Sequence, residues 1–182
     1  MYFEKTGKEN TIKTLELALE TARNRNIKHI VLASSSGETA SLLSNVKDIN
    51  IICVTHAYGF KNSGENDMSD DVRKNLIKKG VKVLSTTHVL SGAERGISKK
   101  FGGISPVEII ASTLRMFGQG TKVAVEVAIM AADSGLIPYA EPIISIGGTH
   151  YGADTAIIIK PDHANNILDT KIEEIICKPS SI

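Results

Sequence analysis

Apolar positions along the chain follow two spacings, and these predict alternating helices and strands. A three- or four-residue spacing over residues 10–24 makes one apolar stripe, which predicts an amphipathic helix. Short continuous apolar runs are instead typical of strands buried on both faces of a parallel sheet. Four such runs, each followed by polar or small residues, occupy residues 27–32, 49–54, 81–84 and 142–146.

Helix-start and helix-end residues separate these runs. A helix is predicted over 38–44, directly after a turn of serines. Ser69 is a good N-cap for a further helix, with acidic residues in its first turn and Gly80 just beyond its end. Ser105 and Glu108 have the spacing of a capping box, which predicts another helix start.

The second half of the chain is less regular. A long irregular segment is predicted over 89–104, and such loops are uncommon unless they are functional or disordered. The helix predicted over 120–133 has little polar face, so it is either deeply buried or part of a subunit contact.

The last strands complete the predicted sheet. The connection before residues 155–160 is too short for a helical crossover, which predicts an antiparallel strand at an edge. An apolar run within 169–179 fits one more edge strand. The sequence therefore predicts a single α/β domain over residues 1–182: three α/β/α layers around a mostly parallel sheet with an antiparallel edge strand.

Composition narrows the function classes. The 182 residues are 42% hydrophobic and 23% charged, which is typical of one globular domain. A net charge of +1 gives no basis for nucleic-acid binding. We expect no signal peptide, and no apolar run is long enough to span a membrane. Cys53 and Cys177 lie far apart in apolar runs, which predicts buried, reduced thiols and therefore a cytoplasmic protein.

The most informative stretch is the turn after the first strand. An apolar run ends abruptly at three serines and a glycine, and a helical segment follows at once. Free backbone N–H groups and a partial positive charge at a helix N-terminus suit a phosphate, and hydroxyl groups add donors. An ordinary turn with a serine N-cap fits the same residues. The candidate phosphate site comprises Ser34, Ser35, Ser36, Gly37, Glu38 and Thr39.

The other predicted strands also end in small, hydroxyl or imidazole residues. Parallel strands direct their carboxyl ends into one crevice, where ligands bind in open α/β sheets, so we expect these ends to meet the serine turn. Three histidines there could ligate a metal, but no metal-ligand spacing accompanies them, and we expect none. The candidate binding residues are Thr55, His56, Thr87, His88, Gly147, Gly148, Thr149 and His150.

Two further stretches are candidate anion sites. Gly120, Thr121 and Lys122 begin a predicted helix, although a glycine C-cap followed by a threonine N-cap explains them equally well. The long 89–104 segment carries three basic residues that either fold over a ligand or stay solvated. They are Arg95, Lys99 and Lys100. The fingerprints of Rossmann, P-loop and serine-hydrolase sites do not occur.

The serine turn resembles a loop of the pyruvate kinase C-terminal α/β domain, which has the pattern Ser-x-Ser-Gly-x-Thr and holds a phosphate. Here it reads Ser34-Ser35-Ser36-Gly37-Glu38-Thr39. The order of helices and strands from about residue 10 to 160 is similar too. The resemblance implies that fold and a phosphate held by Ser34, Ser36, Gly37 and Thr39. The barrel with that enzyme's catalytic residues has no counterpart here, so no kinase reaction is implied.

The long 89–104 segment and the Gly147-Gly148-Thr149-His150 turn are more similar to stand-alone archaeal members of this domain family. Those members are associated with bound FMN, so the resemblance implies FMN as a cofactor. Its ribityl chain and ring would lie along the strand ends. The nearest stacking candidates are Tyr58, Phe101 and Tyr151.

Three functions remain open. The first is binding of FMN, or a similar phosphorylated small molecule, at the carboxyl ends of the strands of a homo-oligomer, with or without flavin redox activity. The second is a non-catalytic regulatory module that binds a sugar phosphate or nucleotide and acts through oligomerisation. The third is a hydrolase or isomerase with a strand-end histidine as general base.

Overall fold

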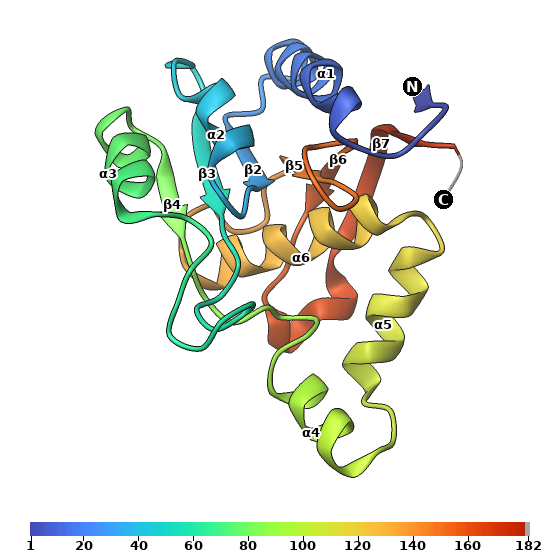
Figure 1. Ribbon diagram of the computed structural model, residues 1–182. Helices are drawn as coiled ribbons and strands as arrows, with labels where there is room; N and C mark the ends of the chain where they lie inside the picture. The colour runs from blue at the N-terminus through green and yellow to red at the C-terminus, as the bar shows by residue number, and fades with distance from the viewer. Residues whose placement is uncertain (181–182) are drawn as a thin grey trace.

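The computed structural model describes residues 1–180, and a seven-stranded mixed sheet lies at their centre (Figure 1). In spatial order its strands are β1 (Tyr2–Phe3), β7 (Lys171–Pro179), β6 (Thr155–Lys160), β5 (Ile143–Gly147), β2 (His29–Ala33), β3 (Asn50–Val54) and β4 (Lys82–Leu84). The neighbours β5, β2, β3 and β4 are parallel, whereas β6 is antiparallel to both β5 and β7. Parallel strands therefore bring four carboxyl ends to one side of the sheet.

Helices cover both faces of the sheet, which confirms the three-layer α/β/α fold. They are α1 (Thr11–Asn24), α2 (Glu38–Leu43), α3 (Asp70–Lys78), α4 (Ala93–Phe101), α5 (Pro106–Arg115) and α6 (Gln119–Asp133). Two 3-10 turns, η1 (Lys8–Asn10) and η2 (Ala164–Asp169), lie near the chain ends. The predicted caps are present: the Ser69 hydroxyl accepts a hydrogen bond from Val72 N–H at 3.4 Å, and the Glu108 carboxylate accepts one from Ser105 N–H at 3.0 Å.

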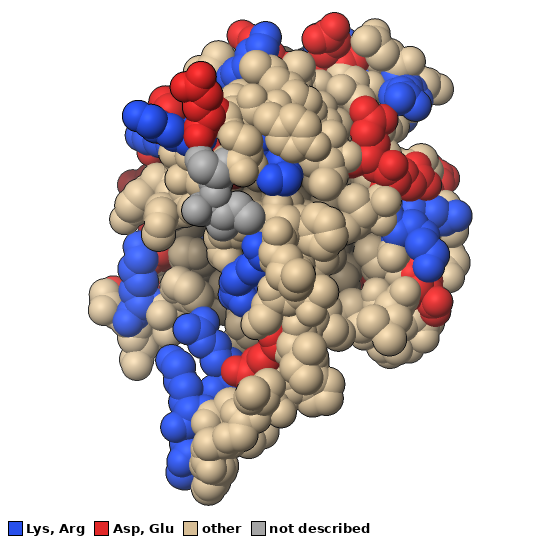
Figure 2. All heavy atoms as spheres, turned by 90° about the vertical axis from the view of Figure 1, so that its right-hand side faces the viewer, with Lys and Arg blue, Asp and Glu red and all other residues tan. Residues whose placement is uncertain are grey.

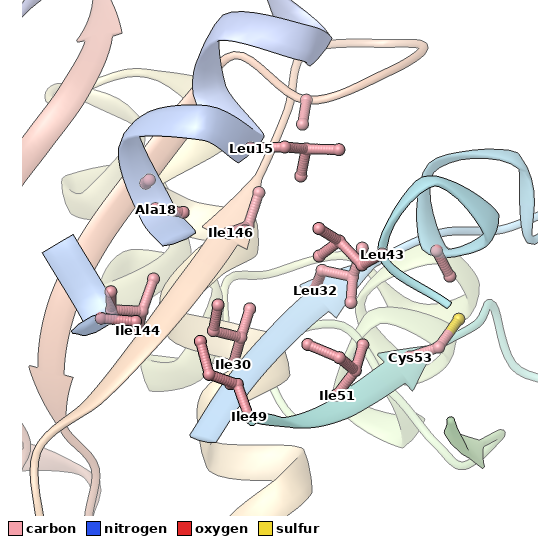
Figure 3. Close-up of a cluster of buried hydrophobic side chains, with 14 of the residues drawn as sticks. Leu15, Ala18, Ile30, Leu32, Leu43, Ile49, Ile51, Cys53, Ile144 and Ile146 are labelled. Carbon is pink, nitrogen blue, oxygen red and sulfur yellow. The ribbon is translucent and has the colours of Figure 1, made fainter. Parts of the chain in front are cut away.

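Successive side chains of the central strand β2 point to opposite faces of the sheet and pack against different helices. Ile30 and Leu32 pack with Leu15 of α1 and Leu43 of α2, as Figure 3 shows. Val31 packs on the opposite face, against α6. Because both faces are covered, every position must be apolar, and this produces the continuous apolar run in the sequence.

The strand predicted over 155–160 is β6, and its edge position is wrong although its antiparallel direction is confirmed. β7 pairs with its other side, and β1 pairs with β7. The prediction rested on a short connection, which determines a strand's direction but not its second neighbour. The buried residues from Ala156 to Ile159 have the composition of an interior strand.

Residues 89–104 are not an irregular loop, because they contain α4. With α5, this helix forms an arm (residues 93–117) that projects from the body of the protein (Figure 1). α4 buries none of its residues, and α5 buries only Ala111. Gly96 lowers the helix propensity of this segment, so the sequence did not predict a helix there. The arm exposes six large apolar side chains: Ile97, Phe101, Ile104, Ile109, Met116 and Phe117.

The apolar helix predicted over 120–133 is α6, and it is buried by its own chain. It packs on β2, β5 and β6 and is covered by α5. Of the two interpretations of its composition, deep burial is therefore confirmed, and α6 supplies no free apolar face for a subunit contact.

The two cysteines are buried and free, as predicted. Burial raises the pKa of the Cys53 thiol to about 12, which keeps it unreactive. Within residues 1–180, no helix has the length and apolarity needed to cross a membrane. The same residues hold no group of three or more His, Cys, Asp or Glu side chains that could bind a metal ion.

Two glycines allow the start of α6 to touch the end of β5 and the start of β6. A Cβ on Gly147 would lie 2.2 Å from the Gly120 carbonyl oxygen and 2.8 Å from the Ala124 nitrogen. A Cβ on Gly120 would lie 2.1 Å from Thr155 Oγ1. Backbone atoms cannot move aside as a flexible side chain does, so this contact requires glycine.

Gly147→Ala should therefore lower the free energy of unfolding by roughly 1–3 kcal/mol, because α6 must shift away from the sheet. Urea unfolding measures the change. Gly96→Ala is the matched control: its Cβ would meet no atom within 4 Å, and in α4 it should stabilise the protein by up to about 1 kcal/mol. A Gly147→Ala protein as stable as the wild type would contradict the close contact.

Candidate functional site

A cavity of about 440 Å³ lies beyond the carboxyl ends of β2 and β3. One wall is the serine loop (residues 34–39), and the residues after β3 form a second. Arg95 and Arg115 of the arm and the inner face of α6, from Gln119 to Met130, form another wall. The turn after β5, with Gly148 and His150, supplies the rim. The predicted crevice is therefore present.

The serine loop has the backbone conformation that its glycine predicts. Gly37 has φ +87°, and a Cβ there would lie 2.6 Å from Val72 Cγ1. Long hydrogen bonds connect the loop to α2: Ser34 Oγ accepts from Ala40 N–H at 3.4 Å, and Ser36 Oγ accepts from Glu38 N–H at 3.5 Å. The serine hydroxyls thus lie beside the first turn of α2, at the cavity wall.

An aromatic cluster lines the cavity beyond the ends of β3 and β4. The rings of His56 and Phe60 stack with centroids 3.9 Å apart, and the His88 ring lies 5.6 Å from His56 and 5.3 Å from Phe60. His56 Nδ1 is 2.7 Å from an Asp67 carboxylate oxygen. His88 Nε2 accepts a hydrogen bond from Ala57 N–H at 3.3 Å, so a neutral His88 carries its proton on Nδ1.

A buried ion pair occupies the α6 wall. Lys122 Nζ lies 2.5 Å from Glu126 Oε2, and these side chains are only 5% and 6% exposed. The other Glu126 oxygen accepts a hydrogen bond from Leu90 N–H at 2.9 Å. Burial lowers the pKa of Lys122, although Glu126 opposes this.

The arm contributes cations to the same cavity. Arg95 of α4 and Arg115 of α5 both line it, and Arg115 Nε donates to Gln119 Oε1 at 2.8 Å. Lys99 and Lys100 follow in the last turn of α4, and Figure 2 shows basic side chains gathered along one side of the arm. Arg95 alone among the three basic residues predicted in this segment lines the cavity.

The cavity brings together eleven of the predicted binding residues. They are Ser34, Ser35, Ser36, Glu38, Thr39, Thr55, His56, His88, Lys122, Gly148 and His150. Gly37 turns the loop behind them and packs on α3. Tyr151 also lines the cavity, whereas Tyr58 is exposed and Phe101 lies at the tip of the arm, 75% exposed.

Besides Gly37, five predicted residues do not line this cavity. Gly120 and Gly147 make the helix–strand contact described above. The buried Thr121 hydroxyl donates to the Phe117 carbonyl at 3.2 Å, and Thr149 N–H donates to Asp154 at 3.2 Å. Thr87 lines a separate, more open hollow beside α4.

Several lining residues were not predicted. Phe60 lies in a loop without a periodic pattern, so nothing in the sequence brings it to His56. Arg115 ends a helix whose direction the sequence does not determine. Glu126 was not predicted either, although it carried a signal: it lies four residues after Lys122 in an otherwise apolar helix, so the two charges must share one face.

Two histidines, His88 and His29, should make the protein less stable at acidic pH. Burial lowers the pKa of His88, reinforced by His56, Lys122 and Arg95 and opposed by Glu126, and burial also lowers the pKa of His29 at the far end of β2. Each binds fewer protons folded than unfolded, so the free energy of unfolding should fall as the pH drops below about 6.5.

Urea unfolding of His88→Gln and His29→Gln between about pH 5 and 8 tests this dependence. Each substitution should reduce the fall at acidic pH, and the effects should add because the sites are distant. A double variant with the wild-type pH profile would show that other groups control it.

Comparison with known proteins supports the fold. The model of the family "Pyruvate kinase, alpha/beta domain" matches residues 12–159. A structure of Cryptosporidium parvum pyruvate kinase in complex with ADP matches with a TM-score of 0.41 and 18% identity, over 80% of this chain and 22% of that chain. Since the family model spans most of the 182 residues, the chain belongs to the pyruvate kinase alpha/beta domain family.

Proposed function

We propose that this chain binds a phosphorylated small molecule in the cavity, with the phosphate at the serine loop. One observation carries the proposal: the hydroxyl groups of that loop and the side chains of Arg95 and Arg115 line a single cavity. Hydroxyl and backbone N–H donors together with cations are the groups that hold phosphate in proteins.

The charges around the cavity favour an anion. α2 has only six residues, so its dipole alone is a weak attraction. The two acidic residues on the walls are already paired, Glu126 with Lys122 and Glu38 with Lys8. Arg95 and Arg115 therefore give the cavity its net positive charge.

We propose FMN as the ligand to test first. The volume of about 440 Å³ lies within the range of small-molecule sites, roughly 300–1,000 Å³. The rings of His56, Phe60 and His88 offer flat surfaces for a flavin ring. Bound FMN would supply electron-transfer chemistry, and the chain would hold its phosphate and ring.

The alternative is a regulatory module that binds a sugar phosphate or nucleotide and acts through assembly. The apolar side chains of the arm favour it, because large exposed apolar groups gathered on one element mark contact surfaces. In this alternative the arm, rather than α6, contacts a second copy of the chain.

Ser36→Ala and Thr39→Val should each weaken FMN binding. Loss of one charge-assisted hydrogen bond costs about 1.5–3 kcal/mol, which corresponds to a tenfold or greater increase in Kd. Quenching of flavin fluorescence measures the affinity. The control is Ser112→Ala, which removes an exposed hydroxyl on α5 outside the cavity and should leave the Kd unchanged. Equal Kd values for all four proteins would place the phosphate elsewhere.

A charged residue at the tip of the arm should prevent assembly without affecting folding. Phe101 and Ile104 are 75% and 76% exposed, so Phe101→Glu and Ile104→Glu should not lower the free energy of unfolding. Light scattering after size exclusion should show a wild-type mass above 19.5 kDa and variants nearer to it. A monomeric wild type, with and without ligand, would contradict assembly through the arm.

A further inference from the structure

Lys122 is an unusual residue for its position. Its side chain is 5% exposed, yet it lines the cavity. It is the fourth residue of α6, near the helix end where the dipole disfavours a positive charge. Val123, Val127 and Met130 beside it on this wall are apolar. Burial also lowers the pKa of Lys122, so more of its amine is unprotonated at neutral pH than in a surface lysine.

We propose that Lys122 is a reactive amine that forms an imine with a phosphorylated aldehyde held in the cavity. This inference rests on the proposed function, because the serine loop must hold the phosphate. It adds the class of ligand: a molecule with a phosphate at one end and an aldehyde that reaches the α6 wall.

The groups needed for the reaction are in place. Glu126 Oε2, 2.5 Å from Nζ, accepts the proton that the Lys122 ammonium must lose. The Leu90 N–H bond to Oε1 holds that carboxylate in position. The neutral amine attacks the carbonyl carbon and a C–N bond forms, giving a carbinolamine. Its hydroxyl group and the remaining nitrogen-bound proton then leave as water, and a C=N bond remains. No oxidant or reductant is consumed.

The surrounding charges support the neutral amine. Arg95 and Arg115 line the same cavity, and their positive charge disfavours the ammonium form of Lys122. His88 also lines it, and burial lowers its pKa, which keeps the imidazole neutral at neutral pH. The proton that the Glu126 carboxylate has accepted can pass to the departing hydroxyl group.

A buried lysine–glutamate pair can instead be purely structural. That interpretation predicts an inert ammonium group, because Glu126 would hold the proton on Lys122. The two interpretations therefore differ in the reactivity of one amine, which covalent trapping measures directly.

The test treats the full chain with low concentrations of pyridoxal 5′-phosphate, which combines a phosphate, a flat ring and an aldehyde. Sodium borohydride reduces any imine to a stable amine, and peptide mass spectrometry locates it. We expect stronger labelling of Lys122 than of any exposed lysine, since a lowered pKa raises the fraction of free amine. FMN has no aldehyde and should protect Lys122.

Two variants and one alternative reagent serve as controls. Lys122→Arg keeps a cation beside Glu126 but cannot form an imine, so the adduct at this position is lost. Lys74→Arg removes an exposed lysine of α3 outside the cavity and keeps the adduct. Pyridoxal, which lacks the phosphate, should label Lys122 in the wild type at least about tenfold less. Urea unfolding verifies that both variants fold.

The outcomes separate this inference from the proposed function. If FMN or inorganic phosphate binds but Lys122 is labelled no faster than exposed lysines, the reactive amine is overturned and the proposed function stands. Equal labelling by pyridoxal overturns the phosphate-held arrangement. If neither FMN nor inorganic phosphate binds, the proposed function fails, and this inference fails with it.

Discussion

The contact between the first turn of α6 and the end of β5 determines how the cavity is built. Gly120 and Gly147 bring helix and strand together, and the Ser145 hydroxyl donates to the Ala124 carbonyl at 2.6 Å across the same interface. With the helix this close to the sheet, Lys122 and Glu126 face the cavity instead of solvent. A larger residue at either glycine would move the cationic wall away from the serine loop.

The sheet explains why the candidate site lies on one half of the molecule. Four parallel strands bring their carboxyl ends together, whereas β6 and β7 add stability beside them without adding lining residues. Asp154, buried between β5 and β6, accepts hydrogen bonds from Gly7 N–H, Thr149 N–H and the Thr155 hydroxyl. This carboxylate fixes the turn after β5, which forms the rim.

The fold could largely be predicted because its signals are local. Continuous apolar runs identified the buried strands, and caps at Ser69 and Ser105 identified helix starts. The serine loop could be predicted for the same reason, since strand, turn and helix follow one another directly. The misplaced β6 and the overlooked α4 depended on information that is not local: the neighbour on the far side of a strand, and a glycine-containing helix without a core to pack on.

The candidate site was harder to predict because chemistry and packing use the same residue types. From the sequence, Gly120 and Gly147 were predicted to make room for a ligand. In the structure they instead allow α6 to pack closely on the sheet. Phe60 reaches His56 through a loop whose path no pattern encodes. Lys122 was considered for its place at a helix start, yet its partner Glu126 gives it its properties.

The arm connects two surfaces that would otherwise be independent. Arg95 and Arg115 line the cavity, while apolar side chains of the same helices face solvent. A molecule in the cavity and a protein on the outer surface would therefore both bias the same pair of helices. By thermodynamic reciprocity, the factor by which one changes the affinity of the other is the same in both directions. Through the arm, a ligand in the cavity would thus change the affinity of the outer surface for a protein that the ligand does not touch.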